Sequence, residues 1–257
     1  MDFLLECIGF PPSIDERGLV DLARTRGEPA PWRGAPDDHR LLRLGGGLQV
    51  RVDLDGETGA WTLTPFFDVP HRLRLSIESI VRPPESPFDA LLSGWAAPPP
   101  PWAPDQRDGT YPLSTWVTDA RRLGRRVQVG QVVAVSVAGF ALAIDDIVPP
   151  DRRPTRPGLE ATAGASVRPL GGLDAPGGCC DVSLRVRSVR RIRNEVTGET
   201  VEMAVCAAPE RPLTLFLSPW QLRRDGLPPP RPGWRIEGTF LFSGRLSGGV
   251  PRARPTP

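Results

Sequence analysis

The sequence predicts a mainly β protein, in which an N-terminal helix and a β-hairpin precede two small antiparallel β-barrel units. The first observation is composition: 32 prolines and 27 glycines in 257 residues favour short strands and many turns over long helices. The second is the alternation of apolar and polar residues with period two in several short stretches. The third is that one order of strand, turn and glycine occurs in both halves of the chain.

The N-terminal stretch is predicted to contain a strand, a helix and a hairpin. The short apolar run at residues 3–10 indicates a strand. Residues 13–16 have the form of a capping box, which predicts a helix over residues 14–26. Residues 48–54 alternate in polarity, and a polar turn then leads to a return strand over residues 61–67, which is typical of a β-hairpin.

The first β-unit is predicted to begin with a strand over residues 71–81 and to contain a proline-rich insertion over residues 83–112. Within the insertion we predict one helical turn at residues 88–95. The polyproline segment that follows, at residues 95–102, is either a docking motif for an aromatic groove or a stiff loop of its own domain, and the loop is the favoured interpretation. After the insertion, Ser114 is predicted to cap a short helix that carries Trp116.

The second β-unit has the strand order of a small closed barrel of OB type. A long strand over residues 181–193 slips in apolar register between Val186 and Val189, which predicts a bulge. A turn, a strand over residues 201–205 and a strand over residues 213–217 follow. Ser218 and Pro219 then begin a short helix, and a last strand pair starts near residue 234, with Gly244 at its turn or bulge. This argument depends on the order of elements and not on resemblance to a family.

The two β-units are interpreted as a degenerate internal duplication. The matched residues are turn, cap or anchor residues, namely Ser114 with Ser218, Trp116 with Trp220, Gly130 with Gly233, and Gly139 with Gly244. We therefore predict that Trp116 and Trp220 anchor equivalent short helices and that Gly130 and Gly233 mark equivalent bends. Chance similarity is the alternative, because serine, glycine and proline are common in turns.

These predictions divide the chain into five parts. They are an α+β segment packed on the first β-unit (residues 1–70), the first β-unit (71–148), a linker (149–178), the second OB-like unit (179–247) and a disordered tail (248–257).

The sequence contains no spacing typical of a catalytic, metal or cofactor site. With two histidines in the chain, a multi-histidine metal site is excluded. Gly45, Gly46 and Gly47 lack the Gly-Lys-Ser/Thr ending of a phosphate loop and precede a strand. Cys179 and Cys180 are adjacent and are interpreted as a buried pair, with an exposed reactive thiol as the alternative. We predict no catalytic residue, no metal and no cofactor, and an enzyme with a site hidden in tertiary contacts is the least favoured class.

Basic residues are concentrated at the C-terminal end. The chain has no lysine, and residues 179–257 hold 13 arginines against 7 acidic residues, whereas residues 1–70 hold 7 against 12. Such a basic unit can attract anionic partners, although a solvated arginine face is the ordinary explanation. The candidate nucleic-acid contacts are Arg185, Arg187, Arg190, Arg191, Arg193 and Arg235.

The function predicted from these observations is a non-catalytic binding or assembly module whose partner is a protein. The alternative is binding of single-stranded nucleic acid through the basic second unit. The N-terminus lacks the basic region of a secretory signal, and no apolar run is long enough to span a membrane, so a cytoplasmic location is expected.

Overall fold

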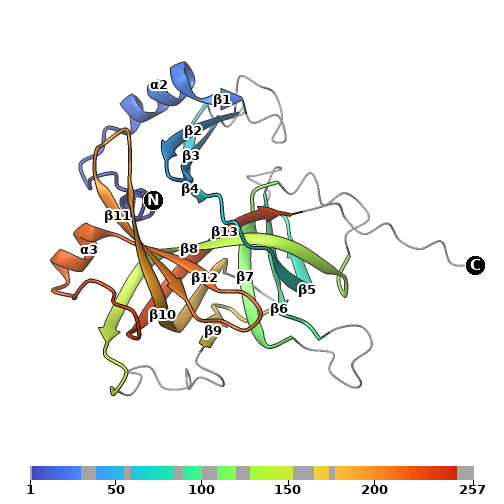
Figure 1. Cartoon of the computed structure of the whole chain (residues 1–257). Coiled ribbons are helices and arrows are strands. Elements are labelled where there is room, and N and C mark those ends of the chain that lie inside the picture. The colour runs from blue at the N-terminus through green and yellow to red at the C-terminus, as the bar shows by residue number, and fades with distance from the viewer. Residues whose placement is uncertain are drawn as a thin grey trace, which may run out of the picture.

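The computed structural model describes residues 2–29, 39–54, 59–83, 89–99, 109–119, 128–152, 165–173 and 177–247. Over these residues the protein is mainly β, as the sequence predicts (Figure 1). The helices are α1 (Asp2–Glu6), α2 (Glu16–Arg26) and α3 (Pro219–Arg224). The strands are β1 (Glu28–Pro29), β2 (His39–Gly45), β3 (Leu48–Leu54), β4 (Trp61–Phe67), β5 (Leu73–Val81), β6 (Ala90–Ala96), β7 (Tyr111–Val117), β8 (Val132–Val148), β9 (Ala165–Pro169), β10 (Cys179–Arg193), β11 (Thr200–Cys206), β12 (Leu213–Leu217) and β13 (Arg235–Leu246).

The first two helices differ in part from the prediction. The strand predicted at residues 3–10 is wrong, because the chain is helical in α1 and then turns. Leu4 and Leu5 are buried, and a short apolar run has no period that separates a buried helix from a buried strand. α2 lies within the predicted helix, but its cap is Asp15 and not Ser13: the Asp15 carboxylate accepts a hydrogen bond from the Arg17 N–H at 3.1 Å.

Strands β1 to β4 form an antiparallel sheet in chain order. The predicted hairpin is confirmed as β3 and β4, which pair from Leu48 with Phe67 to Leu54 with Trp61. Trp61 is only half-buried, and Arg24 of α2 lies over its ring, 6.0 Å from the centroid. The N-terminal helix and the sheet are therefore in contact at this tryptophan.

The other nine strands form one mixed sheet, whose pairings close two rings. The first ring runs β5, β6, β7, β13, β8 and back to β5. The second ring runs β10, β11, β12, β8, β13 and back to β10. The long strands β8 and β13 pair with each other and belong to both rings (Figure 1). The sequence predicts two separate antiparallel units, whereas in the structure each ring takes one strand from the other half and pairs it in parallel.

One hydrogen-bonded detail occurs in both rings. Ile77 of β5 accepts a hydrogen bond from the Gly130 N–H at 2.7 Å and donates to the carbonyl of residue 131 at 2.9 Å. Val186 of β10 does the same with Gly233 at 2.8 Å and with the carbonyl of residue 234 at 2.7 Å. The φ angles of Gly130 and Gly233 are 84° and 86°, which favours glycine. Both strands also shift register directly after the residue concerned, and in β10 this is the predicted bulge. Gly130 and Gly233 thus occupy equivalent places.

The two matched tryptophans do not occupy equivalent places. Trp116 lies in the extended strand β7, and Trp220 lies in helix α3. The helical turn predicted after Ser114 is wrong, because the neighbouring Thr115 and Val117 are β-branched and favour a strand. The helical turn predicted at residues 88–95 is also wrong, since this segment contains β6.

Gly139 and Gly244 lie inside long strands. The turn or bulge predicted at Gly244 is wrong, because this residue pairs with Val137 within β13 and β8. A Cβ atom on Gly244 would lie 2.3 Å from the Ser136 carbonyl oxygen, and one on Gly139 would lie 2.7 Å from the Leu215 side chain. Both glycines therefore allow close approach of neighbouring strands.

The remaining elements of the second half follow the prediction only in part, because in place of the predicted last strand pair the described residues form a single strand, β13. β11, β12 and α3 occur in the expected order, and the Ser218 hydroxyl caps α3 by accepting a hydrogen bond from the Gln221 N–H at 3.0 Å. The predicted linker is in part a strand, because β9 pairs antiparallel with β10. The predicted tail at residues 248–257 and residues 100–102 of the polyproline segment lie outside the described residues, whereas the start of that segment belongs to β6.

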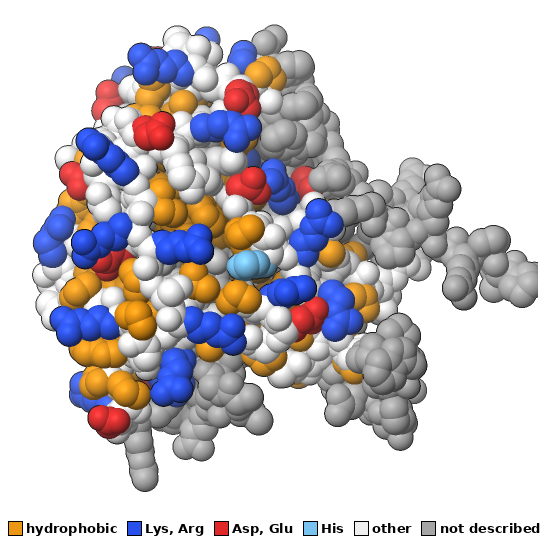
Figure 2. All heavy atoms as spheres, viewed as in Figure 1, with side chains coloured by type: hydrophobic (Ala, Val, Ile, Leu, Met, Phe, Trp, Pro, Cys, Tyr) orange, Lys and Arg blue, Asp and Glu red, His pale blue; other side chains and the backbone are white. Residues whose placement is uncertain are grey.

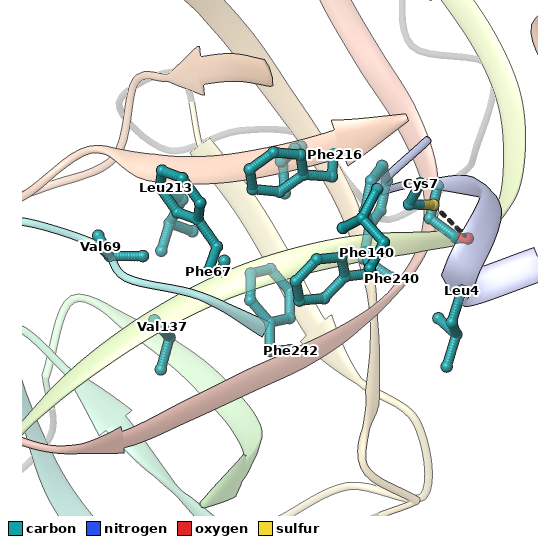
Figure 3. Packing of buried hydrophobic residues seen from close by; sticks show 14 of the residues in the cluster. Leu4, Cys7, Phe67, Val69, Val137, Phe140, Leu213, Phe216, Phe240 and Phe242 are labelled. Atoms are coloured by element: carbon teal, nitrogen blue, oxygen red, sulfur yellow. Dashed lines mark hydrogen bonds between the residues drawn. The ribbon is translucent and has the colours of Figure 1, made fainter. Parts of the chain in front are cut away.

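The core between the two sheets is built on aromatic side chains. Phe216 of β12 stacks on Phe140 of β8 at a centroid distance of 5.4 Å (Figure 3). The ring of Phe67, at the end of β4, lies 4.9 Å from the ring of Phe216, measured between centroids. Phe140, Phe216, Phe240 and Phe242 are fully buried. The core therefore joins the N-terminal sheet to the second ring.

Candidate functional site

The outward face of β11 and β12 is covered by the N-terminal part of the chain. Phe67 lies on Phe216 of β12, and the backbone at Gly9 packs on Val201 of β11. Beside them, the backbone at Gly46 packs on Ile192 of β10. A Cβ atom on Gly9 would be 3.1 Å from Val201 Cγ1, so the approach is close.

Polar contacts hold the same two parts together. Asn194, which is fully buried in the turn between β10 and β11, donates a hydrogen bond to the Ile8 carbonyl oxygen at 2.8 Å. The Thr197 hydroxyl donates to the Gly9 carbonyl oxygen at 2.8 Å. The Ser218 hydroxyl donates to the buried Glu6 carboxylate at 2.7 Å. These contacts are with the second ring, but residues 1–70 also contact the predicted first unit. Cys7 Sγ donates a hydrogen bond to the Ala141 carbonyl oxygen at 3.4 Å, and Arg51 Nη1 donates to the Thr118 carbonyl oxygen at 3.3 Å.

The corresponding face of the first ring is covered by the segment around β9. The Ser79 hydroxyl of β5 donates a hydrogen bond to the Leu173 carbonyl oxygen at 2.8 Å. In β7, the Ser114 N–H lies 3.4 Å from Cys180 Sγ. A Cβ atom on Gly178 would lie 2.4 Å from the Trp116 Nε1 atom, so the backbone at Gly178 packs directly on the Trp116 side chain. Neither outward face is therefore open to a ligand over the described residues.

A hollow remains open beside α3, where the helix and the loop after it face the β10–β11 hairpin. Its volume is about 420 Å³. Its floor is apolar and its rim carries charged side chains; the lining residues are Leu217, Leu222, Leu227, Pro219, Pro229, Thr200, Arg191, Glu202 and Arg223. We call this hollow the α3 groove. It is of the size of a small-ligand or side-chain site, although it is shallow and open.

The charged side chains on the rim of the α3 groove differ in whether they are paired with one another. Glu202 Oε1 accepts hydrogen bonds from Arg191 Nε and Nη2, both at 3.4 Å. The other carboxylate oxygen, Oε2, is buried and has no hydrogen-bond partner among the described residues. Arg223 lies over the Trp220 ring, 5.7 Å from its centroid, and is exposed. On this face of the molecule, arginine side chains lie around an area of apolar ones (Figure 2).

The predicted nucleic-acid contacts fall into three groups. Arg185, Arg187, Arg190 and Arg193 are exposed along β10. Arg191, also exposed, is on the rim of the α3 groove and is held by Glu202. The sixth, Arg235, is partly buried and donates a hydrogen bond to the Ser183 hydroxyl at 3.1 Å.

Arg235 belongs to a polar cluster between β10 and β13. Ser183 and Glu237 are fully buried, and the Ser183 hydroxyl donates to the Glu237 carboxylate at 3.0 Å. The buried Asp181 accepts from the Thr239 hydroxyl at 2.8 Å and from Arg168 Nη2 at 2.9 Å. These side chains satisfy one another across neighbouring strands, which is the arrangement expected of a structural polar ladder.

The four cysteines are free thiols, and three of them are buried. Burial raises the pKa of both Cys7 and Cys180 to about 12, and it also raises the pKa values of Cys179 and Cys206. These thiols are therefore protonated at neutral pH and poor nucleophiles. Cys180 is buried and Cys179 is half-buried, in a strand start as the sequence indicates.

Alkylation with iodoacetamide is expected to modify Cys179 before the other three cysteines in the folded protein, because only its side chain is partly exposed. Stability is expected to fall as pH rises above about 8.5, where thiols of the unfolded chain ionise while the buried ones keep their protons. Mass spectrometry of the alkylated peptides, with urea unfolding at several pH values, checks both. Earlier modification of Cys7 or Cys206 would contradict the buried positions.

Among the described residues, no group of three or more His, Cys, Asp or Glu side chains is arranged to hold a metal ion. His39 and Asp53 form a buried cross-strand pair at 2.9 Å, without such a third ligand. No helix in the described part of the chain is both long and apolar enough to cross a membrane.

Of the residues that line the α3 groove, Arg191 is a contact predicted from the sequence, but the groove itself was not predicted. Leu222 and Leu227 come from the helix and the loop after it, whereas Arg191 and Glu202 come from the hairpin. The one local signal of the groove in the sequence is the proline run at residues 228–230, which prevents the loop after α3 from continuing the helix. Comparison of the chain with protein-family models, with curated proteins and with solved structures finds no match.

Proposed function

We propose that the protein is a non-catalytic module that binds a partner protein, and that the α3 groove is the docking position. The observation that carries this proposal is the groove itself, since it combines an apolar floor with a charged rim. A buried apolar centre within a polar rim is the usual anatomy of a protein-binding site.

We further propose that each ring is a small barrel of OB type. In the second ring β10, β11, β12, β13 and β8 would take the places of strands one to five, with α3 between strands three and four. Barrels of this type bind ligands on the outer face of strands two and three. Here that face is buried under Phe67 and its neighbours, so we propose the open α3 groove as the position for a partner.

Selection of a random linear peptide library on the full-length chain tests the docking position. Peptides that bind are expected to lose affinity for Leu227→Asp, because a carboxylate on the floor of the groove would have to be desolvated on binding. Leu170→Asp is the matched control, since Leu170 is a partly exposed leucine outside the groove. Equal affinity for both variants would remove the α3 groove as the site.

Binding of single-stranded nucleic acid is the second candidate function. It is favoured by the row of exposed arginines on β10, because Arg187, Arg190 and Arg193 have no ionic partner among the described residues. Phosphate contacts of this kind give an affinity that falls steeply with salt. Anisotropy of labelled oligothymidylate with the full chain, at low and high salt, tests it, and absence of binding at low salt would remove it.

A further inference from the structure

Taking the docking role of the α3 groove from the proposed function, we infer the chemistry of its partner: a protein segment that carries a carboxylate side chain next to apolar side chains. The apolar part would lie on Leu222 and Leu227, and the carboxylate would pair with Arg223 at the rim.

The charge balance at the rim carries this inference. Two acidic side chains beside α3 already hold an arginine, Glu202 with Arg191 at 3.4 Å and Asp225 with Arg224 at 3.1 Å. Arg223 has no carboxylate partner among the described residues, and its guanidinium is exposed above Trp220. An incoming carboxylate can therefore pair with Arg223 without breaking an existing ion pair. A guanidinium and a carboxylate form favourable paired hydrogen bonds.

The same groove is less suited to a nucleic acid. Its lining contains no aromatic side chain on which a base could stack. The apolar floor also matches leucine-like side chains and not a sugar–phosphate backbone.

The test begins with peptides selected from a random linear library on the full-length chain. They are expected to be enriched in Asp or Glu beside leucine-like residues. Arg223→Glu should weaken their binding by about tenfold or more, as expected when a paired charge is reversed, and Asn or Gln in place of the peptide carboxylate should do the same.

Arg24→Glu is the matched control. Arg24 is also exposed in the last turn of a helix and also lies over a tryptophan ring, at 6.0 Å from Trp61, but it is remote from the groove. Its reversal should leave binding unchanged, and thermal unfolding of both variants shows whether the fold is kept. Equal weakening by Arg24→Glu would overturn the inference, because it would indicate non-specific charge attraction.

Further outcomes separate the inference from the function on which it rests. Selected peptides could lose affinity for Leu227→Asp but contain no Asp or Glu and bind Arg223→Glu as well as the original chain. That outcome would support docking at the α3 groove and overturn the inference about the carboxylate. If no selected peptide is sensitive to Leu227→Asp, both fail. If oligothymidylate binds the chain and is weakened by Arg223→Glu while acidic peptides do not bind, the groove takes nucleic acid and the inference is overturned.

Discussion

Residues 179–247 expressed alone are expected to be unfolded. This fragment contains β10 to β13 but lacks β8, which pairs with β13 from Val135 to Val148 and with β12 at residues 138–140. Without β8 the ring stays open, and Phe216 loses its stacked partner Phe140. Two strand edges would be unpaired and a fully buried aromatic would be exposed, which a unit of this size does not tolerate.

Residues 71–247 are the matched fragment, because they keep all strands of both rings. This longer fragment is expected to fold, with lower stability than the full chain because Phe67 no longer covers Phe216. Far-ultraviolet circular dichroism and the dispersion of amide proton shifts distinguish the two fragments. A dispersed spectrum and a cooperative transition for residues 179–247 would show that the second ring does not depend on β8.

The fragment experiment concerns the part of the fold that local sequence could not predict. Alternation, caps and turn residues predicted β3, β4, β10, β11, β12 and α3, because these signals act within a few residues. The pairing of β8 with β13 joins segments about 100 residues apart, and the two parallel pairs are also distant in sequence. None of these pairings leaves a local pattern in the sequence, since any strand with an apolar face can pair with several other strands.

The wrong helix cap at Ser114 has a local physical origin. A serine two residues before a tryptophan suggested a helix cap at Ser114 and at Ser218, and only Ser218 caps a helix. At Ser218 the proline that follows is already suited to the first helical turn, whereas at Ser114 the next residues are β-branched. The side-chain oxygen alone was therefore a weaker signal than the residues after it.

The α3 groove could be predicted from sequence only in its parts. The helix and its proline-rich exit are visible in the sequence, and so are the arginines of β10. Their convergence depends on how the β10–β11 hairpin lies relative to α3, which tertiary packing decides. The six candidate arginines likewise separate in the structure, with Arg235 of β13 turned to Ser183 and Arg191 of β10 turned to Glu202.

Replacement of Gly46 by alanine is expected to lower the free energy of unfolding by about 3 kcal/mol. Gly46 has a φ of 58°, where a side chain costs about 1–2 kcal/mol. A Cβ atom there would also lie 2.4 Å from Ile192 Cγ2, and such overpacking costs about 1–3 kcal/mol more. The glycines after β2 thus do more than give a flexible loop, because they let the N-terminal sheet approach the second ring.

Gly226→Ala separates the two contributions. Gly226 has a similar φ of 66°, but a Cβ atom there would meet nothing within 4 Å. Its replacement is expected to cost only the backbone part, about 1 kcal/mol. Urea unfolding of both variants gives the comparison, and a cost at Gly46 no greater than that at Gly226 would contradict the close contact with Ile192.

The contact can also be isolated by a double-mutant cycle with Ile192→Ala. If the clash is the cause, Gly46→Ala should cost about 3 kcal/mol beside isoleucine and only about 1 kcal/mol beside alanine, because the shortened side chain leaves room for the new Cβ atom. An unchanged cost would assign the whole effect to backbone strain. Since Ile192 lies on β10 and Gly46 in the N-terminal sheet, the coupling measures directly how tightly that sheet is held on the second ring.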